Sequence, residues 1–173
     1  MTELDKLGEQ LLDPAFIKLA QRQFDKSHPG LQELGIEVVS IGEGRASMRL
    51  PYDPKFIGDR NSGSLHGGII TTLMDTLCGL CVMATLRTPT PIATLDLRMD
   101  YLRPTRRGLD IIAEAECYSR TKSVAFVRGF ALQGDEREPV AHCNASFMLN
   151  TKGANFPTSN FSSIHTDAEA GHG

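Results

Sequence analysis

Hydrophobic residues recur along this chain in two rhythms, one helical and one strictly alternating. The helical rhythm dominates residues 67–86, a run that holds a single charged side chain, Asp75. The run opens with Gly67-Gly68 and is apolar around its whole circumference. A helix of this kind that does not cross a membrane must be covered by protein on most sides. We therefore predict a central helix that starts at the two glycines.

The alternating rhythm appears on both sides of this helix and predicts about six β-strands. Two short runs precede the helix, at residues 35–41 and 45–50, with a turn between them. Four longer runs follow it, at residues 91–104, 109–119, 123–133 and 139–150. The connections between these four runs are short, which favours antiparallel neighbours. The pattern predicts an α+β fold in which one long helix lies against an antiparallel sheet.

Alternation also predicts which strand residues face the helix. In the first long run, one face is expected to carry Ala93, Leu95, Leu97, Met99 and Tyr101, and the opposite, polar face Thr94, Asp96, Arg98 and Asp100. In the second, the expected apolar face is Leu109, Ile111, Ala113, Ala115 and Cys117, and in the fourth it is Ala141, Cys143, Ala145, Phe147 and Leu149. One sheet covers only one side of a helix, so a second copy of the chain is expected to cover the rest.

The remaining segments divide the chain into one domain and two extensions. Residues 1–33 are predicted to form an N-terminal helical extension, with a helix over 14–26 that residues 28–30 end. Residues 34–150 form the predicted domain, in which 51–64 is expected to be a loop. Residues 151–173 are polar and rich in Gly, Ser and Asn, as is typical of a tail with little structure of its own.

A membrane span has to be considered for residues 67–86, because about 20 apolar residues can cross a bilayer. A carboxylate at mid-bilayer costs about 3 kcal/mol, and Asp75 would lie there. The run also contains four threonines and three glycines, and no basic cluster flanks it. We therefore expect no membrane span and a buried helix instead.

Composition narrows the classes of partner and compartment. The net charge is −3, which argues against nucleic acid as the main partner, because binding phosphate backbones needs a basic surface. The first ten residues have no signal-peptide pattern. The cysteines Cys78, Cys81, Cys117 and Cys143 lie in apolar or alternating segments, without metal-ligand spacing. We expect reduced, structural cysteines in a cytoplasmic protein without a metal or cofactor.

Candidate chemistry concentrates at the start of the helix. Gly67 and Gly68 allow a ligand to approach the backbone closely, and the first helical turn offers free N–H groups and a positive dipole end. Such a place can stabilise a carbonyl oxygen that gains negative charge. A tight turn without any ligand is the alternative. His66 can cap the helix, orient the loop or contact a ligand, and Asn61 is either a turn residue or a contributor to the same place.

Asp75 is the second candidate, because an unpaired carboxylate in an apolar helix is costly. It either pairs structurally or takes part in chemistry. Gly68 and Asp75 are seven residues apart, so they stand about 10 Å apart along one helix. A carboxylate must come within about 3–3.5 Å of the carbon that it attacks. If both residues serve one carbonyl, Asp75 is expected to come from an antiparallel helix of a second subunit, giving two symmetric sites.

These residues resemble a known family. His66-Gly67-Gly68, Asp75 nine residues after the histidine, and a long strand that ends in residues 100–104 resemble the hotdog-fold acyl-CoA thioesterases of the PaaI-like group. The order of one helix after two strands and before four strands matches as well. The resemblance covers roughly residues 34–149. It implies a hotdog fold, in which the sheet wraps the helix, and a dimer or dimer of dimers with active sites between subunits.

The resemblance also implies roles for individual residues. Asp75 is expected to be the catalytic carboxylate, as nucleophile or as general base, and the Gly68 N–H to polarise the thioester carbonyl. Gly67 is expected to contact the substrate. His66 and Asn61 match loop positions that contact the thioester or position water. Thr94 matches a position that helps to hold the water from across the interface.

The acyl-CoA substrate would also need contacts for its phosphates. Arg103, Arg120 and Lys122 lie at strand ends and are expected to provide them, although any one of them can be an ordinary solvated charge. Two other functions on the same fold stay open: a non-catalytic acyl-CoA-binding or sensing module, and a hydratase. A purely structural dimer is a further alternative that no sequence feature favours. The acyl group itself is not fixed by the sequence.

Overall fold

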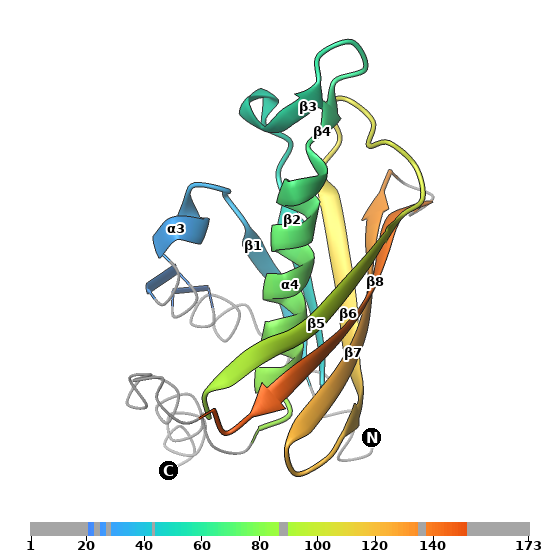
Figure 1. The fold of residues 1–173 in the computed structure, drawn as a ribbon. Helices are drawn as coiled ribbons and strands as arrows, with labels where there is room; N and C mark the ends of the chain where they lie inside the picture. The colour runs from blue at the N-terminus through green and yellow to red at the C-terminus, as the bar shows by residue number, and fades with distance from the viewer. Residues whose placement is uncertain are drawn as a thin grey trace, which may run out of the picture.

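A long helix lies against one face of a curved sheet in the structure, a computed structural model (Figure 1). It describes residues 21–22, 25–26, 29–42, 44–86, 90–134 and 138–151. The elements in chain order are α3 (Pro29–Gln32), β1 (Glu37–Gly42), β2 (Arg45–Leu50), the 3-10 helix η1 (Pro54–Phe56), β3 (Ile57–Asp59), β4 (Ser64–Leu65), α4 (Gly67–Met83), β5 (Ile92–Tyr101), β6 (Ile111–Arg120), β7 (Val124–Gln133) and β8 (Glu138–Leu149).

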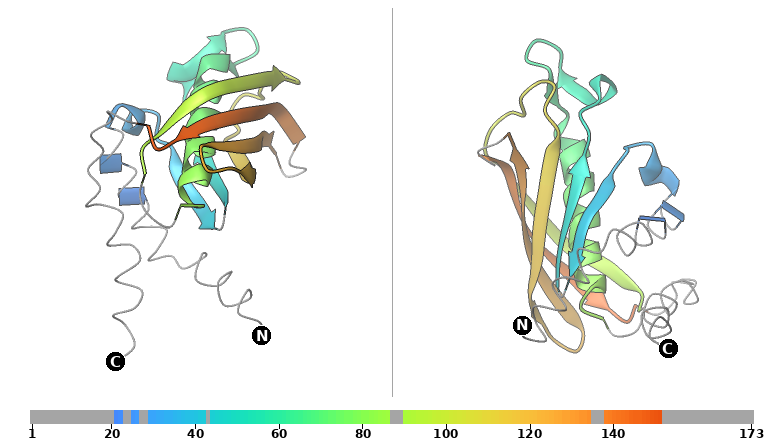
Figure 2. Two further views of the ribbon diagram at one scale, coloured as in Figure 1. Left: turned by 60° about the horizontal axis from the view of Figure 1, so that its bottom comes forward. Right: turned by 180° about the vertical axis from the view of Figure 1, so that it is seen from behind.

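The main sheet has six strands in the order β1-β2-β6-β7-β8-β5, and every neighbouring pair is antiparallel. The prediction of one helix against six antiparallel strands is confirmed. β1 and β2 lie on one side of α4, and β5 crosses the helix on the other side (Figure 1, Figure 2). The sheet therefore wraps the helix, with β1 and β5 as its two edges.

One predicted neighbour relation is wrong. The short connection at residues 105–108 was expected to join antiparallel neighbours, but β5 pairs with β8 and not with β6. The chain between Tyr101 and Ile111 instead crosses the end of the sheet, from its edge to its interior. A short connection favours pairing of the two strands that it joins, unless other strands pair with them instead. Here β7 pairs with β6 and β8 pairs with β5, so these two strands lie between β6 and β5.

The side of α4 that faces the sheet forms the centre of the core. Its buried residues are Ile70, Leu73, Met74, Leu77, Cys78, Cys81 and Val82. They pack in one core with buried side chains of the sheet, among them Met48, Ala113, Val127 and Cys143. The expected apolar faces of 109–119 and 139–150 are confirmed at Ile111, Ala113, Ala115, Ala141, Cys143, Ala145, Phe147 and Leu149, all of them buried.

The opposite side of α4 differs from the prediction of a helix that is apolar all round. Gly68 is exposed, and Thr72, Asp75, Thr76 and Gly79 are partly exposed. This side therefore carries small and polar residues, with Leu80 and Met83 partly exposed beside them. No helix in the described part of the chain is long and apolar enough to cross a membrane.

A bulge in β5 overturns the strict alternation predicted for that strand. Thr94 pairs with Phe147 and Asp96 with Ser146, so Leu95 is an extra residue without a partner in β8. An extra residue reverses the facing of all positions on one side of it. Thr94 therefore shares the helix-facing side with Leu97, Met99 and Tyr101, and not with Asp96, Arg98 and Asp100 as predicted.

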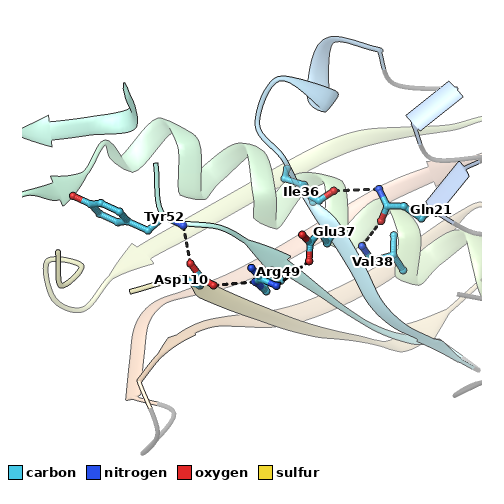
Figure 3. Close-up of polar contacts among 7 residues, drawn as sticks. All are labelled: Gln21, Ile36, Glu37, Val38, Arg49, Tyr52 and Asp110. Carbon is cyan, nitrogen blue, oxygen red and sulfur yellow. Dashed lines mark hydrogen bonds and ion pairs between the residues drawn. The ribbon is translucent and has the colours of Figure 1, made fainter. Parts of the chain in front are cut away.

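The region before the helix holds more structure than predicted. Residues 51–64, expected to be a loop, contain η1, β3 and the first residue of β4, and β3 pairs with β4 as a small hairpin. Asp110 ties the start of this region to the sheet (Figure 3). Its carboxylate accepts the Tyr52 N–H at 2.8 Å and Arg49 Nε at 2.9 Å. Arg49 also pairs with Glu37 on β1 at 3.1 Å.

The N-terminal extension contacts the sheet edge formed by β1. The described residues 21–22 and 25–26 are helical, and the rest of the helix predicted over 14–26 lies outside the described residues, as do residues 152–173 of the predicted tail. The Gln21 amide donates to the Ile36 carbonyl at 3.2 Å and accepts the Val38 N–H at 2.5 Å (Figure 3). It thus satisfies one backbone group of an edge strand and one of the residue just before it. Pro29 begins the separate short helix α3.

Gly129 gives a test of the packing between helix and sheet. A Cβ placed on Gly129 would lie 2.9 Å from Met74 Cε and 3.0 Å from the Glu114 carbonyl oxygen. We expect Gly129→Ala to lower the free energy of unfolding by about 1–3 kcal/mol, because overpacking forces neighbours to shift. Urea denaturation measures this change.

Gly79→Ala is the matched control. Its Cβ would make ordinary contacts at 3.8–3.9 Å, and alanine favours a helix interior by about 1 kcal/mol over glycine. We expect this variant to be at least as stable as the wild type. Equal destabilisation by the two changes would contradict the packing described.

Candidate functional site

His66 caps the first turn of α4. Its backbone is extended, with φ −65° and ψ 130°, and its Nδ1 accepts the Gly68 N–H at 3.0 Å. The His66 N–H donates to the carbonyl of Phe56, the last residue of η1, at 2.8 Å, so the segment before the helix fixes where it begins. Of the three sequence-level interpretations, the structure shows capping. The Gly68 N–H, which was expected to polarise a carbonyl, is therefore hydrogen-bonded to the histidine.

Tyr101, the last residue of β5, lies against the same turn. A Cβ on Gly67 would stand 3.2 Å from the Tyr101 ring, tighter than an ordinary van der Waals contact, so glycine favours this close approach. The Tyr101 hydroxyl donates to the Gly67 carbonyl at 2.8 Å and lies 2.5 Å from Thr71 Oγ1. The sequence interpretation gave Tyr101 no role. In the sequence, Tyr101 stands at the end of an alternating apolar run, and that position predicts a residue that packs in the core.

Asp75 lies where α4 meets β5. Thr94 Oγ1 donates to Asp75 Oδ1 at 3.0 Å, and both residues belong to the same chain. The bulge at Leu95 makes this contact possible, because it turns Thr94 toward the helix. The expectation of a buried carboxylate is wrong for the single chain, since Asp75 is partly exposed.

The other candidates lie apart from this pair within one chain. Asp75 and Gly68 stay about 10 Å apart along the uninterrupted helix α4. Asn61 is exposed in the loop of the β3–β4 hairpin, where its backbone N–H donates to Asp59 Oδ1 at 3.1 Å. The single chain thus brings together Gly67, Gly68 and His66, and separately Asp75 and Thr94.

The three basic candidates lie at opposite ends of the sheet. The Arg103 N–H donates to the Val140 carbonyl at one end of β8, and the Leu149 N–H donates to the Ser123 carbonyl at the other end, beside Lys122. Nine residues of strand separate these points, which is roughly 30 Å. Arg120 and Lys122 border a hollow of about 550 Å³. The three residues therefore cannot bind one phosphate group from a single chain.

The cysteines are free thiols, and Cys78, Cys81 and Cys143 are buried. Cys78 Sγ lies 3.6 Å from Cys143 Sγ, and this contact together with burial raises the pKa of the Cys78 thiol. Burial also raises the pKa of Cys81 to about 12. Thiols of this kind are poor nucleophiles. Within the described ranges, no cluster of His, Cys, Asp and Glu is arranged to hold a metal ion.

Comparison with known proteins identifies relatives of this chain. A family model described as the thioesterase superfamily matches residues 62–140. The medium/long-chain acyl-CoA thioesterase YigI of Escherichia coli is 30% identical over 146 residues, which are 77% of this chain and 93% of YigI. A Halobacterium salinarum protein named as a candidate esterase is 41% identical over 91 residues. That match spans 51% of this chain and 59% of the relative.

The fold is also that of a solved structure. The PaaI protein from the phenylacetic acid degradation operon of Escherichia coli superimposes with a TM-score of 0.68 at 19% identity. The match covers 80% of this chain and 95% of PaaI. At this identity the likeness concerns the fold alone.

Thr105 fixes the segment that leads into the helix and gives a test of it. Its buried hydroxyl oxygen accepts the Leu65 N–H at 2.8 Å and lies 3.2 Å from Ser64 Oγ. We expect Thr105→Val to lower the free energy of unfolding by about 1–3 kcal/mol, because the Leu65 N–H then loses its acceptor. Thr105→Ser keeps the oxygen and should lose less than about 1 kcal/mol. Equal urea stability of the two variants would show that the hydrogen bond contributes nothing.

Proposed function

This chain belongs to the thioesterase superfamily, and we propose that it hydrolyses an acyl-CoA thioester to a free acid and CoA. The family, the fold and the thioesterase class expected from the sequence are confirmed at the level of the family. The observation that carries the proposal is the partly exposed Asp75 carboxylate, held by the Thr94 hydroxyl. The similarity to YigI, a medium/long-chain acyl-CoA thioesterase, supports acyl-CoA as the substrate class.

Asp75 is the proposed catalytic carboxylate. Thr94 occupies Oδ1, which orients the carboxylate and leaves Oδ2 to act. As a general base, Asp75 takes a proton from water while the water oxygen attacks the thioester carbon. As a nucleophile, Asp75 attacks that carbon itself, and water then hydrolyses the resulting anhydride. In both routes the C–S bond breaks, CoA leaves as a thiolate and the thiolate takes up a proton.

The Gly68 N–H is the proposed donor to the thioester oxygen. It lies in the first turn of a 17-residue helix, where the dipole favours developing negative charge. Because His66 Nδ1 accepts this N–H, the substrate oxygen has to take the place of the imidazole. His66 is exposed, so its side chain has room to turn away. His66 is then free to contact the thioester or its water, and Asn61 and Gly67 are proposed to line the same entrance.

A second copy of the chain completes the proposed site. β5 is an edge strand with one open side, and its residues 93–96 are exposed, with Leu95 at 50%. A long open edge is a template for pairing with another strand. A twofold axis normal to the sheet would pair β5 with its copy and lay the two α4 helices antiparallel on one face. Gly68 of one helix then approaches Asp75 of the other, in a dimer or a dimer of dimers.

The CoA phosphates are proposed to bind at Arg120 and Lys122. Both side chains are exposed, and they border the same hollow at the β6–β7 turn. Arginine and lysine are the usual partners of phosphate oxygens. Arg103, at the other end of the sheet, can join them only from the partner subunit.

Substitution of the carboxylate tests the proposal. We expect Asp75→Asn to lower the rate of CoA release from a panel of acyl-CoAs by at least ~100-fold, because an amide neither attacks nor takes a proton. A thiol reagent measures this release. Asp96→Asn is the matched control on β5, since the bulge places Asp96 on the outer face, and it should keep the wild-type rate.

Two outcomes would contradict the assignment. Undiminished hydrolysis by Asp75→Asn would remove Asp75 from the reaction. Tight acyl-CoA binding by the wild type without any turnover would indicate a binding or sensing module instead.

A further inference from the structure

The peptide group between Gly67 and Gly68 is held from both sides. Its carbonyl accepts the Tyr101 hydroxyl at 2.8 Å and lies 3.1 Å from Thr71 Oγ1. Its N–H, which belongs to Gly68, donates to His66 Nδ1 at 3.0 Å. The Gly68 N–H, which is proposed to polarise the substrate, therefore belongs to a peptide unit whose carbonyl is hydrogen-bonded to Tyr101 of β5.

We propose that Tyr101 is a positioning residue that orients and polarises the Gly68 N–H through the Gly67 carbonyl. This inference rests on the proposed function and goes beyond it. A peptide unit is planar, so fixing the direction of its carbonyl fixes the direction of its N–H. Hydrogen bonds in a chain polarise one another, so a donor bound to the carbonyl makes the N–H a better donor in turn.

The two glycines explain why such an anchor is needed. Neither Gly67 nor Gly68 has a Cβ, so their backbone dihedrals are the least restricted in the helix. Three side-chain contacts hold the unit instead: the cap from His66 on its N–H, and the hydroxyls of Tyr101 and Thr71 on its carbonyl. When substrate displaces the imidazole, the two hydroxyls on the carbonyl remain to restrain the orientation of the N–H, and the Tyr101 hydroxyl is the nearer of the two.

The hydroxyls of Tyr101 and Thr71 act together. Three oxygens, those of Tyr101, Thr71 and the Gly67 carbonyl, lie within 2.5–3.1 Å of one another. The two hydroxyls supply two hydrogens for three contacts, so one contact is always left without its own hydrogen. With both hydroxyls donating to the carbonyl, the contact between the two hydroxyls is the one left without a hydrogen.

Core packing does not account for Tyr101. Its side chain is 51% exposed, although the residue ends a strand that lies over the core. Its ring lies so close to Gly67 that a Cβ there would stand 3.2 Å from it. The hydroxyl of Tyr101 is thus directed to the Gly67 carbonyl. Removal of this hydroxyl leaves most of the buried surface of the protein unchanged.

Kinetics of Tyr101→Phe test the inference. We expect kcat to fall about tenfold with KM within about twofold, a smaller loss than the 10²–10³ that follows removal of an oxyanion donor itself. The unfolding midpoint should not change. Tyr118→Phe is the matched control: Tyr118 is 54% exposed and lies beside Arg128, far from the helix start, so it should keep the wild-type kcat. Thr71→Ser should retain more activity than Thr71→Val, because it keeps the hydroxyl.

Carbonyl spectroscopy gives a readout that a merely structural role would not move. Acyl-CoA labelled with ¹³C at the thioester carbonyl is bound to the slow Asp75→Asn variant, and its infrared band is recorded with and without Tyr101→Phe. We expect a smaller shift to low frequency when the hydroxyl is absent. An unchanged band together with wild-type kcat in Tyr101→Phe would overturn the inference. If the wild type hydrolyses no acyl-CoA at all, the proposed function fails instead, and the two failures are distinct.

Discussion

The rigidity of α4 is the constraint on which the rest of the site depends. One unbroken helix carries both Gly68 and Asp75, and its rise keeps them about 10 Å apart. A reaction at a carbonyl needs its donor and its carboxylate within a few ångströms of the same two atoms. No rotation of side chains closes that distance within one chain. A site that uses both residues must therefore combine two copies, and the antiparallel arrangement follows from the twofold symmetry of a dimer.

The edge strand β5 serves both halves of such a site. Near its start, Thr94 holds the Asp75 carboxylate, and at its end Tyr101 holds the carbonyl of Gly67. The same strand leaves one side open for pairing with a second chain. Pairing of two β5 strands would thus bring together the Gly68 N–H groups and the Asp75 carboxylates of both chains. The strands that position these groups would lie at the same interface. This coupling gives a physical reason for an edge strand that is long and only lightly protected.

Much of the fold could be predicted from the sequence, because helical and alternating patterns each have one period. The central helix, the six strands and most of their buried faces follow directly from those periods. The incorrect predictions concern structural features that leave no repeating pattern in the sequence. The bulge at Leu95 leaves the apolar alternation of 91–104 intact in the sequence, so nothing there signals that Thr94 turns to the helix. The crossing of 102–110 over the sheet end follows from the places of β7 and β8 between β6 and β5.

The candidate site was predictable to the extent that its residues are chemically unusual. Asp75 is conspicuous as one charge in an apolar run, and Gly67-Gly68 as a pair at a helix start. Tyr101 was not, since a tyrosine at the end of an apolar face usually packs in the core. Arg103, Arg120 and Lys122 looked alike as strand-end charges, yet roughly 30 Å of β8 separates the first from the other two. Such distances become known only with the topology.

Subunit mixing tests the two-chain site most directly. Asp75→Asn lacks the carboxylate, and Gly68→Val crowds the donor, because a Cβ there would lie 3.0 Å from His66 Nδ1, whose place the substrate oxygen has to take. Each variant alone should be nearly inactive. A refolded equal mixture should recover about a quarter of the wild-type activity, since half of the dimers are hybrids and each hybrid has one intact site. A mixture no more active than the mean of its two components would contradict a site shared between subunits.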